Sequence, residues 1–401
     1  MGRRNSRKRR EKAEKKSKRI LFVNFLPLLL ILLVVGYLIY MYVSFGDIKS
    51  ENPIEQNNAS YYLLSNAKDT LEKTLIVFEE EYNEKERIKS AYMYAENKDK
   101  GAAVLVYLPG WVEYGGVEGD FGSAISISTF RYAGEFLQEG RGIEYAIWQF
   151  EQLLGSNIDN YIWFTSSATN LFIEKLEGEN SSSLYAQYYA NGFESSEEVF
   201  FMNSLASKLG WFNLLTSSSK FKESEAVIYS SHRTVANTVI RLKQIYQSTL
   251  SLRPYIIDLS NGAYLLSQAS SSGVGISNYI DVSKYDSKWG EFIEGIIDKE
   301  LEKERVRVEV YNGSDLPGYA AQYARRIRNS GCDVVRYDNA PSKQQNTQFY
   351  VPNPEEFDNS LEIILELFPG SQEIVEGRPA FMTTGDIVIV LGEDIPTAYS
   401  F

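Results

Sequence analysis

The stretch ILFVNFLPLLLILLVVGYLIYMYVSF, residues 20 to 45, decides how the rest of this 401-residue chain is arranged. It holds no charged residue, and only Asn24, Pro27, Gly36 and Ser44 interrupt its apolar and aromatic side chains. An α-helix rises about 1.5 Å per residue, so a helix of this length can cross a hydrocarbon core of about 30 Å. The stretch therefore predicts a single transmembrane helix.

The flanks of this helix predict its orientation. Residues 1–19 contain eleven Lys or Arg and two Glu, which leaves 30 of the 41 basic and 51 of the 53 acidic residues for the rest of the chain. Basic flanks stay on the cytoplasmic side, so we expect a cytoplasmic tail and an extracytoplasmic body. Beside a membrane span the tail is expected to contact anionic lipid, and no nucleic-acid partner is predicted.

A cleaved signal peptide is the alternative interpretation of the same stretch. Ser44 and Gly46 loosely match a small-x-small cleavage site. The apolar core of a signal peptide is only about 7–15 residues long, shorter than this stretch, so the membrane anchor is favoured.

The rare residue types restrict the possible chemistry. Cys332 is the only cysteine and His232 the only histidine. These counts exclude an internal disulfide, a cysteine-based metal cluster and a multi-histidine metal site. Any catalysis must rest on the remaining polar side chains, on a bound metal or on a substrate phosphate, unless His232 itself is catalytic.

The polar residues 46–69 are interpreted as a linker, and residues 70–285 as a first domain. Apolar runs predict strands, and the spacing of apolar residues in GIEYAIWQFEQLL predicts a helix that Gly155 ends with a left-handed cap. Strands and helices that alternate in this way are typical of a layered α/β domain. The strands are expected at Leu71–Phe78, Ala102–Leu108 and Tyr161–Phe164, and the helices at Gly142–Leu154, from Thr165 to Leu176, and at Thr234–Leu250.

Three further segments have simpler interpretations. Ser267–Gly275 is rich in serine and glycine and predicts a surface loop. The acidic run Glu79–Glu81 has no metal-ligand spacing and is expected to lie on a solvated face. Lys288–Lys303 is amphipathic and predicts a helix near a domain boundary, with residues 286–304 as a helical connector.

The last hundred residues predict a second, smaller α/β sandwich at residues 305–395. Its pattern is β-α-β-β-α-(β)-β. The strands are expected at Val306–Tyr311, Cys332–Tyr337, Gln348–Val351 and Asp386–Leu391, and the helices after Pro317 and after Pro354.

These segments carry a resemblance. VEVYNGSDLPGYAAQYARRIRNSGCDVVRYDNA (Val308–Ala340), Thr347 and IVIVLGED (Ile387–Asp394) resemble the C-terminal domain of LytR-type envelope proteins. Residues 70–250 are similar to the LytR-CpsA-Psr (LCP) domain, above all from Phe130 to Gly178, which includes YAIWQFEQLLGSNIDNYIWF (Tyr145–Phe164).

The resemblance implies a function in the cell envelope. LCP proteins transfer anionic glycopolymers from a polyprenyl pyrophosphate carrier to the cell wall, and their arginines and aspartates hold the pyrophosphate and a divalent metal. Guanidinium groups and Mg²⁺ suit this task because they neutralise charge that develops on the leaving phosphate.

This chain differs from LCP proteins at the positions that would hold the pyrophosphate and the metal. The segment Lys89-Ser90-Ala91 stands where the family has Arg-Ser-Asp, and Leu108-Pro109-Gly110-Trp111 stands where it has Ile-Pro-Arg-Asp. Arg233 and Arg241 could replace the family's later arginines, although a solvated helix face explains them equally well. Lys89, Asp120 and Arg131 are further candidates for ligand binding.

The sequence therefore predicts a single-pass cell-membrane protein with an N-terminal transmembrane helix and two extracytoplasmic α/β domains. The favoured function is a catalytically degenerate LCP-like protein that binds polyprenyl-linked glycopolymer, wall polymer such as peptidoglycan, or a partner enzyme, without a cofactor. The alternatives are an active phosphotransferase, which would need Mg²⁺, and a non-catalytic scaffold.

Overall fold

The computed structural model describes residues 25–40, 43, 49–54, 71–83, 85–115, 124–169, 227–232, 234–269, 276–297, 299–368 and 373–395. The chain divides into two compact units. One unit contains residues 1–48 and 211–224, and the other contains residues 49–210 and 225–401.

In the first unit, residues 25–40 form a helix whose side chains are exposed. Among the described residues no helix is both long enough and apolar enough to span a membrane. The rest of the predicted span, residues 20–24, 41, 42, 44 and 45, lies outside the described residues, as do residues 1–19. The transmembrane helix therefore stays a prediction.

The second unit is built on a mixed sheet, in the order β1-β8-β7-β2-β3-β4-β9 among the described strands. Its centre is the long antiparallel hairpin of β2 and β3, and β7 pairs with β2 in parallel. The strands are β1 (Lys49–Glu51), β2 (Leu71–Tyr82), β3 (Lys85–Asn97), β4 (Ala102–Pro109), β7 (Asn160–Phe164), β8 (Val227–Ser230) and β9 (Tyr255–Asp258).

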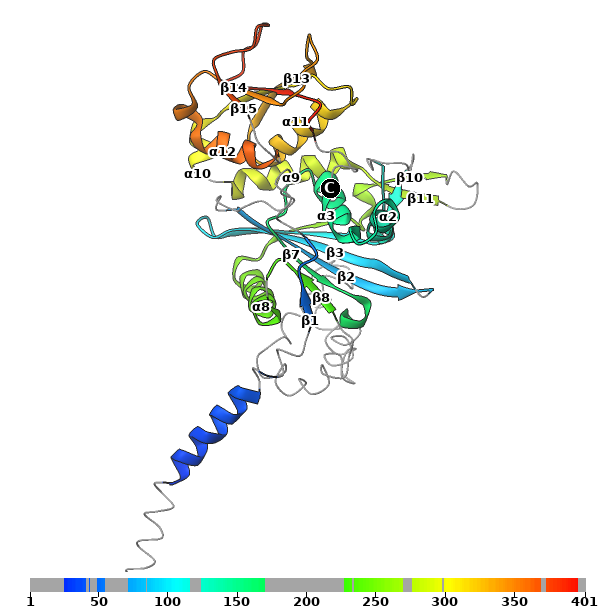
Figure 1. Ribbon diagram of the computed structural model, residues 1–401, viewed down its shortest axis with the longest axis vertical. Helices are drawn as coiled ribbons and strands as arrows, with labels where there is room; N and C mark the ends of the chain where they lie inside the picture. The colour runs from blue at the N-terminus through cyan, green and yellow to red at the C-terminus, as the bar shows by residue number, and fades with distance from the viewer. Residues whose placement is uncertain are drawn as a thin grey trace, which may run out of the picture. The chain divides into compact units, whose positions relative to one another are not determined.

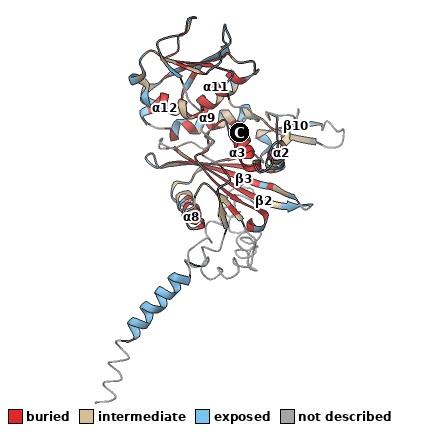
Figure 2. Cartoon of the chain, viewed as in Figure 1, coloured by how far each residue is buried: buried red, intermediate tan, exposed pale blue. Residues whose placement is uncertain are grey.

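Helices cover both faces of this sheet, with α2 (Phe130–Leu137) and α3 (Gly142–Leu154) on one face and α8 (Val235–Leu252) on the other (Figure 1). Figure 2 shows that the buried residues concentrate in the central strands and in α3. Helix α3 has the predicted bounds, and Gly155 follows it with a φ of 61°, the left-handed cap that the sequence predicts. The layered α/β fold is therefore confirmed.

A small second sheet corrects one prediction. Ser267–Gly275 was expected to be a loop, but its first three residues belong to β10 (Leu265–Ala269), which pairs antiparallel with β11 (Ile276–Ile280); residues 270–275 lie outside the described residues. Ser267 is compatible with a strand because pairing with Asn278 satisfies its backbone. On its other side β11 pairs with β5 (Glu113–Tyr114), and β5 pairs with β6 (Ile125–Ser126). The 3-10 helix η1 (Ile127–Thr129) follows β6 in the chain.

The helix expected at Lys288–Lys303 is instead two helices. α9 (Val282–Ile296) begins six residues earlier because the side chain of Asp281 accepts a hydrogen bond from the backbone N–H of Lys284, which caps its first turn. α10 (Lys299–Glu304) follows after a break at Ile297, which is extended.

The C-terminal α/β region has the predicted order of elements. Its sheet runs β13-β12-β16-β14-β15, and the central strand β16 is buried along its whole length. Helices α11 and α12 pack on one face (Figure 1). The elements are β12 (Arg307–Asn312), α11 (Tyr319–Asn329), β13 (Asp333–Asn339), β14 (Gln348–Val351), η4 (Pro354–Phe357), α12 (Asp358–Glu366), β15 (Glu373–Glu376) and β16 (Ile387–Leu391).

Helix α11 is joined to the end of α3 by hydrogen bonds. The guanidinium of Arg325 donates to the carbonyl oxygens of Gln152 and Leu153 and forms an ion pair with Asp286 at 2.6 Å. Asn329 donates to the carbonyl of Leu154 at 3.2 Å. The last carbonyls of a helix have no partner within it, so α11 satisfies those of α3.

Candidate functional site

The two segments that replace the family's motifs lie side by side in the sheet. Strands β3 and β4 pair antiparallel, with Ser90 opposite Pro109 and Ala91 opposite Leu108. The backbone N–H of Gly110 donates to the carbonyl oxygen of Lys89 at 2.9 Å. The structure therefore brings the two motif positions together at one end of the sheet.

At this place the backbone leaves no room for a side chain at Gly110. A Cβ atom there would lie 2.2 Å from the carbonyl oxygen of Ile88 and 2.7 Å from that of Lys89. The following residue, Trp111, is 53% exposed, and Lys89 is exposed as well. An arginine at Gly110 would therefore require the backbone to move.

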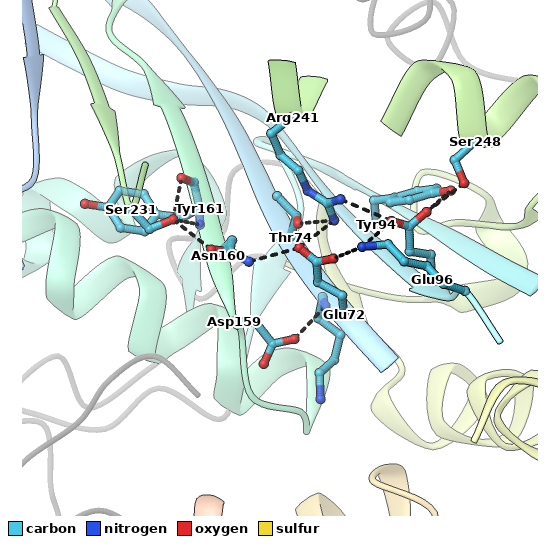
Figure 3. Close-up of polar contacts among 12 residues, drawn as sticks. Glu72, Thr74, Tyr94, Glu96, Asp159, Asn160, Tyr161, Ser231, Arg241 and Ser248 are labelled. Carbon is cyan, nitrogen blue, oxygen red and sulfur yellow. Dashed lines mark hydrogen bonds and ion pairs between the residues drawn. The ribbon is translucent and has the colours of Figure 1, made fainter. Parts of the chain in front are cut away.

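A buried cluster around Arg241 lies between α8 and the sheet (Figure 3). The guanidinium forms ion pairs with Glu96 at 3.1 Å and with Glu72 at 3.0 Å, and it donates to the hydroxyl of Thr74 at 3.1 Å. Only 5% of the Arg241 side chain is exposed. The solvated helix face considered for Arg241 is therefore wrong, because α8 directs this residue onto polar strand residues.

The two glutamates of this cluster are held by further hydrogen bonds. Glu96 Oε2 accepts from Ser248 of α8 at 2.6 Å and from Tyr94 at 3.3 Å. Glu72 accepts from Asn160 at 3.2 Å and pairs with Lys98 at 2.8 Å. The cluster thus fixes α8 to β2 and β3, and its arginine is already neutralised by carboxylates of the same chain.

A second cluster lies at the other end of the hairpin, around Arg131 of α2. One guanidinium nitrogen donates to Glu79 at 2.6 Å and to Glu86 at 2.8 Å, and the Ser166 hydroxyl donates to Glu86 at 2.8 Å. The Glu79 side chain has no exposed surface. The expectation of a solvated acidic run is therefore wrong for Glu79, because the strand turns this residue under α2.

The two acids of this second cluster are shifted in opposite directions. Burial raises the pKa of Glu79 to about 8, and the positive charge of Arg131 opposes this rise. Burial also acts on Glu86, but hydrogen bonding by the Glu79 carboxyl and the Ser166 hydroxyl outweighs it and lowers the pKa of Glu86. Glu79 therefore favours its protonated form more than Glu86 does, although both contact Arg131.

The two clusters are too far apart to form one site. Glu86, which binds Arg131, and Glu96, which binds Arg241, are ten residues apart on β3, which is about 33 Å. Arg131 and Arg241 therefore do not converge on one ligand. Arg233 and Asp120 lie outside the described residues.

No metal site emerges from the described residues, which hold no group of three or more His, Cys, Asp or Glu side chains placed to bind a metal ion. Burial lowers the pKa of His232, which is therefore neutral at pH 7.

The glutamates that bind the arginines were not predicted as site residues. For Glu96 a signal exists, because Tyr92, Tyr94 and Glu96 alternate along β3 and so share one face.

One comparison with known proteins concerns the C-terminal region. Residues 305–394 match the family described as LytR cell envelope-related transcriptional attenuator. The resemblance of the C-terminal region to the C-terminal domain of LytR-type proteins is thereby confirmed, and it connects this part of the chain with the cell envelope. A comparison with curated protein sequences gives no match.

Several solved structures are distantly similar to the chain. The transcriptional regulator YvhJ from Bacillus subtilis is 13% identical, with 57% of this chain and 98% of that chain covered and a TM-score of 0.38. TagV from B. subtilis is 12% identical, with 57% and 98% covered and a TM-score of 0.39. TagT bound to LI-WTA is 12% identical, with 60% and 98% covered and a TM-score of 0.37. These similarities are too distant to assign an activity.

Proposed function

We propose that this protein is a single-pass membrane protein of the cell envelope whose LCP-like domain binds a polyprenyl-linked glycopolymer without transferring it. The basic tail lies in the cytoplasm and both α/β domains lie outside the membrane. Three features support this proposal: the envelope-related family of the C-terminal region, the sequence resemblance of residues 70–250, and the apolar residues 20–45.

The main support for the proposal is that two arginines are already paired with acidic side chains of the same chain. Arg241 and Arg131 each lie between two glutamates of the same chain. A pyrophosphate would have to displace these carboxylates, and the second motif position is a glycine in contact with the neighbouring strand. Phosphoryl transfer depends on cations that are free to neutralise the leaving group. At the motif positions the described residues offer one exposed cation, Lys89, in place of two arginines, and no aspartate.

One observation favours a second candidate, an active glycopolymer phosphotransferase. Glu79 has a pKa of about 8 and lies beside the ionised Glu86, an arrangement that can give or take a proton near neutral pH. In this candidate function Glu79 would be the general acid or base, Arg131 would bind phosphate, and Mg²⁺ would be supplied by the solution.

The experiment measures binding of a polyprenyl pyrophosphate to the full-length protein in detergent micelles, with Mg²⁺ and with a chelator. We expect equal binding in both conditions and no cleavage of the pyrophosphate bond, which would release polyprenyl monophosphate. Arg131→Gln and Arg233→Ala should leave the dissociation constant within about twofold, a change of roughly 0.4 kcal/mol.

Two other outcomes are informative. Mg²⁺-dependent binding that Arg131→Gln or Arg233→Ala abolishes would contradict the proposal and support the phosphotransferase, with turnover lost in Glu79→Gln. The absence of any binding by a folded protein would instead support a scaffold that contacts protein partners. Lys243→Ala is the control, because this basic residue of α8 makes no ion pair within the described residues.

A further inference from the structure

The two edges of the C-terminal sheet differ. At one edge, β15 is four residues long and begins and ends with glutamate. At the other edge, β13 (DVVRYDN) is seven residues long (Figure 1). Short strands, charged side chains and β-bulges protect an edge from pairing. β13 is longer than β15, and after the register shift at Val335 it is regular from Arg336 to Asn339. Among the described residues, only β12 pairs with β13.

The free side of β13 is open to solvent. Val335 and Tyr337 are 46% and 53% exposed, and Arg336, Asp338 and Asn339 are exposed too. The backbone N–H of Ala340 donates to Asn312 of β12 at 2.8 Å. Neighbouring residues of a strand direct their backbone groups to opposite sides. Counting back from Ala340, Asn339 and Tyr337 direct their N–H and C=O groups toward the free edge.

The sequence around Tyr337 is complementary to itself. In an antiparallel pair centred on this residue, Tyr337 lies opposite Tyr337 of the other copy, and Arg336 lies opposite Asp338 on both sides of the centre. Opposite charges directly across an antiparallel pair are stabilising. Within one chain Arg336 and Asp338 already contact each other at 3.0 Å, which shows that both side chains lie on the same face of the strand.

From these observations we propose that β13 is a homodimerisation edge, where a second copy of this chain pairs antiparallel about a twofold axis at Tyr337. The pairing joins the two C-terminal sheets into one continuous sheet. Tyr337 exchanges backbone hydrogen bonds with its counterpart, and two Arg336–Asp338 pairs fix the register. A strand edge of seven residues buries less than the roughly 1,600 Å² of a standard interface, so the dimer is weak and is best detected by covalent trapping.

The first test uses single cysteines in the full-length protein in detergent, followed by mild oxidation and non-reducing electrophoresis. In a hydrogen-bonded antiparallel pair the Cα atoms of Tyr337 and its counterpart lie about 5.5 Å apart, within the range that a disulfide spans. Tyr337→Cys is therefore expected to form a covalent dimer. The two copies of residue 335 would lie about 14 Å apart, which is too far.

Val335→Cys is thus the matched control and is expected to stay monomeric. The unsubstituted protein is a second control, because Cys332 is buried and its burial raises the pKa of the thiol to about 12. Equal cross-linking at positions 335 and 337, or a Tyr337→Cys protein that stays monomeric under oxidation, would overturn the proposal.

A second test uses charge reversal in the Tyr337→Cys background. Arg336→Asp places like charges opposite each other in its homodimer, and so does Asp338→Arg. Each is expected to weaken dimerisation by about tenfold. Mixing the two variants restores opposite charges at both positions and should restore the covalent dimer. These residues are exposed, so folding is not at risk, and a mixture that stays monomeric would contradict the register.

Discussion

The two ends of the β2–β3 hairpin carry the same residue types but differ in what surrounds them. At one end Arg241 lies between Glu72 and Glu96, and at the other Arg131 lies between Glu79 and Glu86. Both oxygens of Glu96 receive hydrogen bonds from protein donors, Arg241 on one and Ser248 and Tyr94 on the other. In the second cluster burial dominates for Glu79, which keeps its proton to about pH 8.

This difference shows that the composition of a charge cluster does not determine its behaviour. A buried carboxylate that several donors contact acts as a fixed structural element, whereas one that is desolvated without enough donors becomes a proton-binding group. The first cluster fixes α8 to the sheet. The second contains an acid, Glu79, whose pKa is raised to about 8.

The largest expected effect is the loss of Arg241. Arg241→Ala leaves Glu96 buried without its cation, which destabilises the fold by about 3–5 kcal/mol, measured by denaturant unfolding. The same helix supplies the control, Lys243→Ala, which is expected to change stability by less than about 0.5 kcal/mol. If Arg241→Ala were as stable as the unsubstituted protein but failed to bind carrier lipid, Arg241 would be a ligand-binding residue instead.

The second prediction concerns the pH dependence at the opposite end. The pKa of Glu79 is raised in the folded state from 4.5 to about 8, so its contribution to stability is complete below pH 4.5 and is lost as the pH rises through 8. Glu79→Gln removes this dependence. The difference in unfolding free energy between the two proteins should change by up to about 1.4 kcal/mol per pH unit in that window.

The control for this measurement is Glu81→Gln, an exposed residue of the same strand. Its stability curve is expected to run parallel to that of the unsubstituted protein. Parallel curves for Glu79→Gln would show that Glu79 is ionised at neutral pH and that the two clusters do not differ in this respect.

A smaller effect is expected at Gly110, the glycine at the second motif position. Gly110→Ala places a Cβ against the carbonyl oxygens of Ile88 and Lys89, so β3 or β4 must shift. Overpacking of this kind costs about 1–3 kcal/mol, which thermal unfolding measures as a lower midpoint. Gly115→Ala has no atom within 4 Å of the added Cβ and should leave the midpoint nearly unchanged.

The local parts of this fold could be predicted from sequence, and the pairing of charges could not. Helix α3 has an apolar face and a glycine cap within its own residues, so its bounds follow from local pattern. Glu96, which pairs with Arg241, is 145 positions away in the chain. It lies on β3, where its neighbours on the same face are tyrosines. In the sequence pattern of α8, Arg241 does not belong to the apolar face. Only the structure shows that its side of the helix is buried against polar residues of the sheet.

The same distinction applies to the candidate site. The resemblance to the LCP domain marks Lys89 and Gly110 as positions that differ from its motifs, and pairing of β3 with β4 shows that they are neighbours. The acids Glu79 and Glu86 could not be recognised, because their role depends on Arg131, 45 positions after Glu86 in the chain, and on Ser166 at the end of β7. Burial, which sets their pKa values, is a property of the folded molecule.

The contact between α11 and α3 has a consequence for synthesis of the chain. Arg325 emerges from the ribosome 173 positions after Gln152, whose carbonyl it satisfies. Domains generally begin to fold while the chain is being made, from the N-terminal side. Throughout that interval α3 ends in carbonyl groups that only water can satisfy. A chain shortened before Tyr319 would therefore keep this end open permanently, and we expect it to be a better substrate for proteases than the full-length protein.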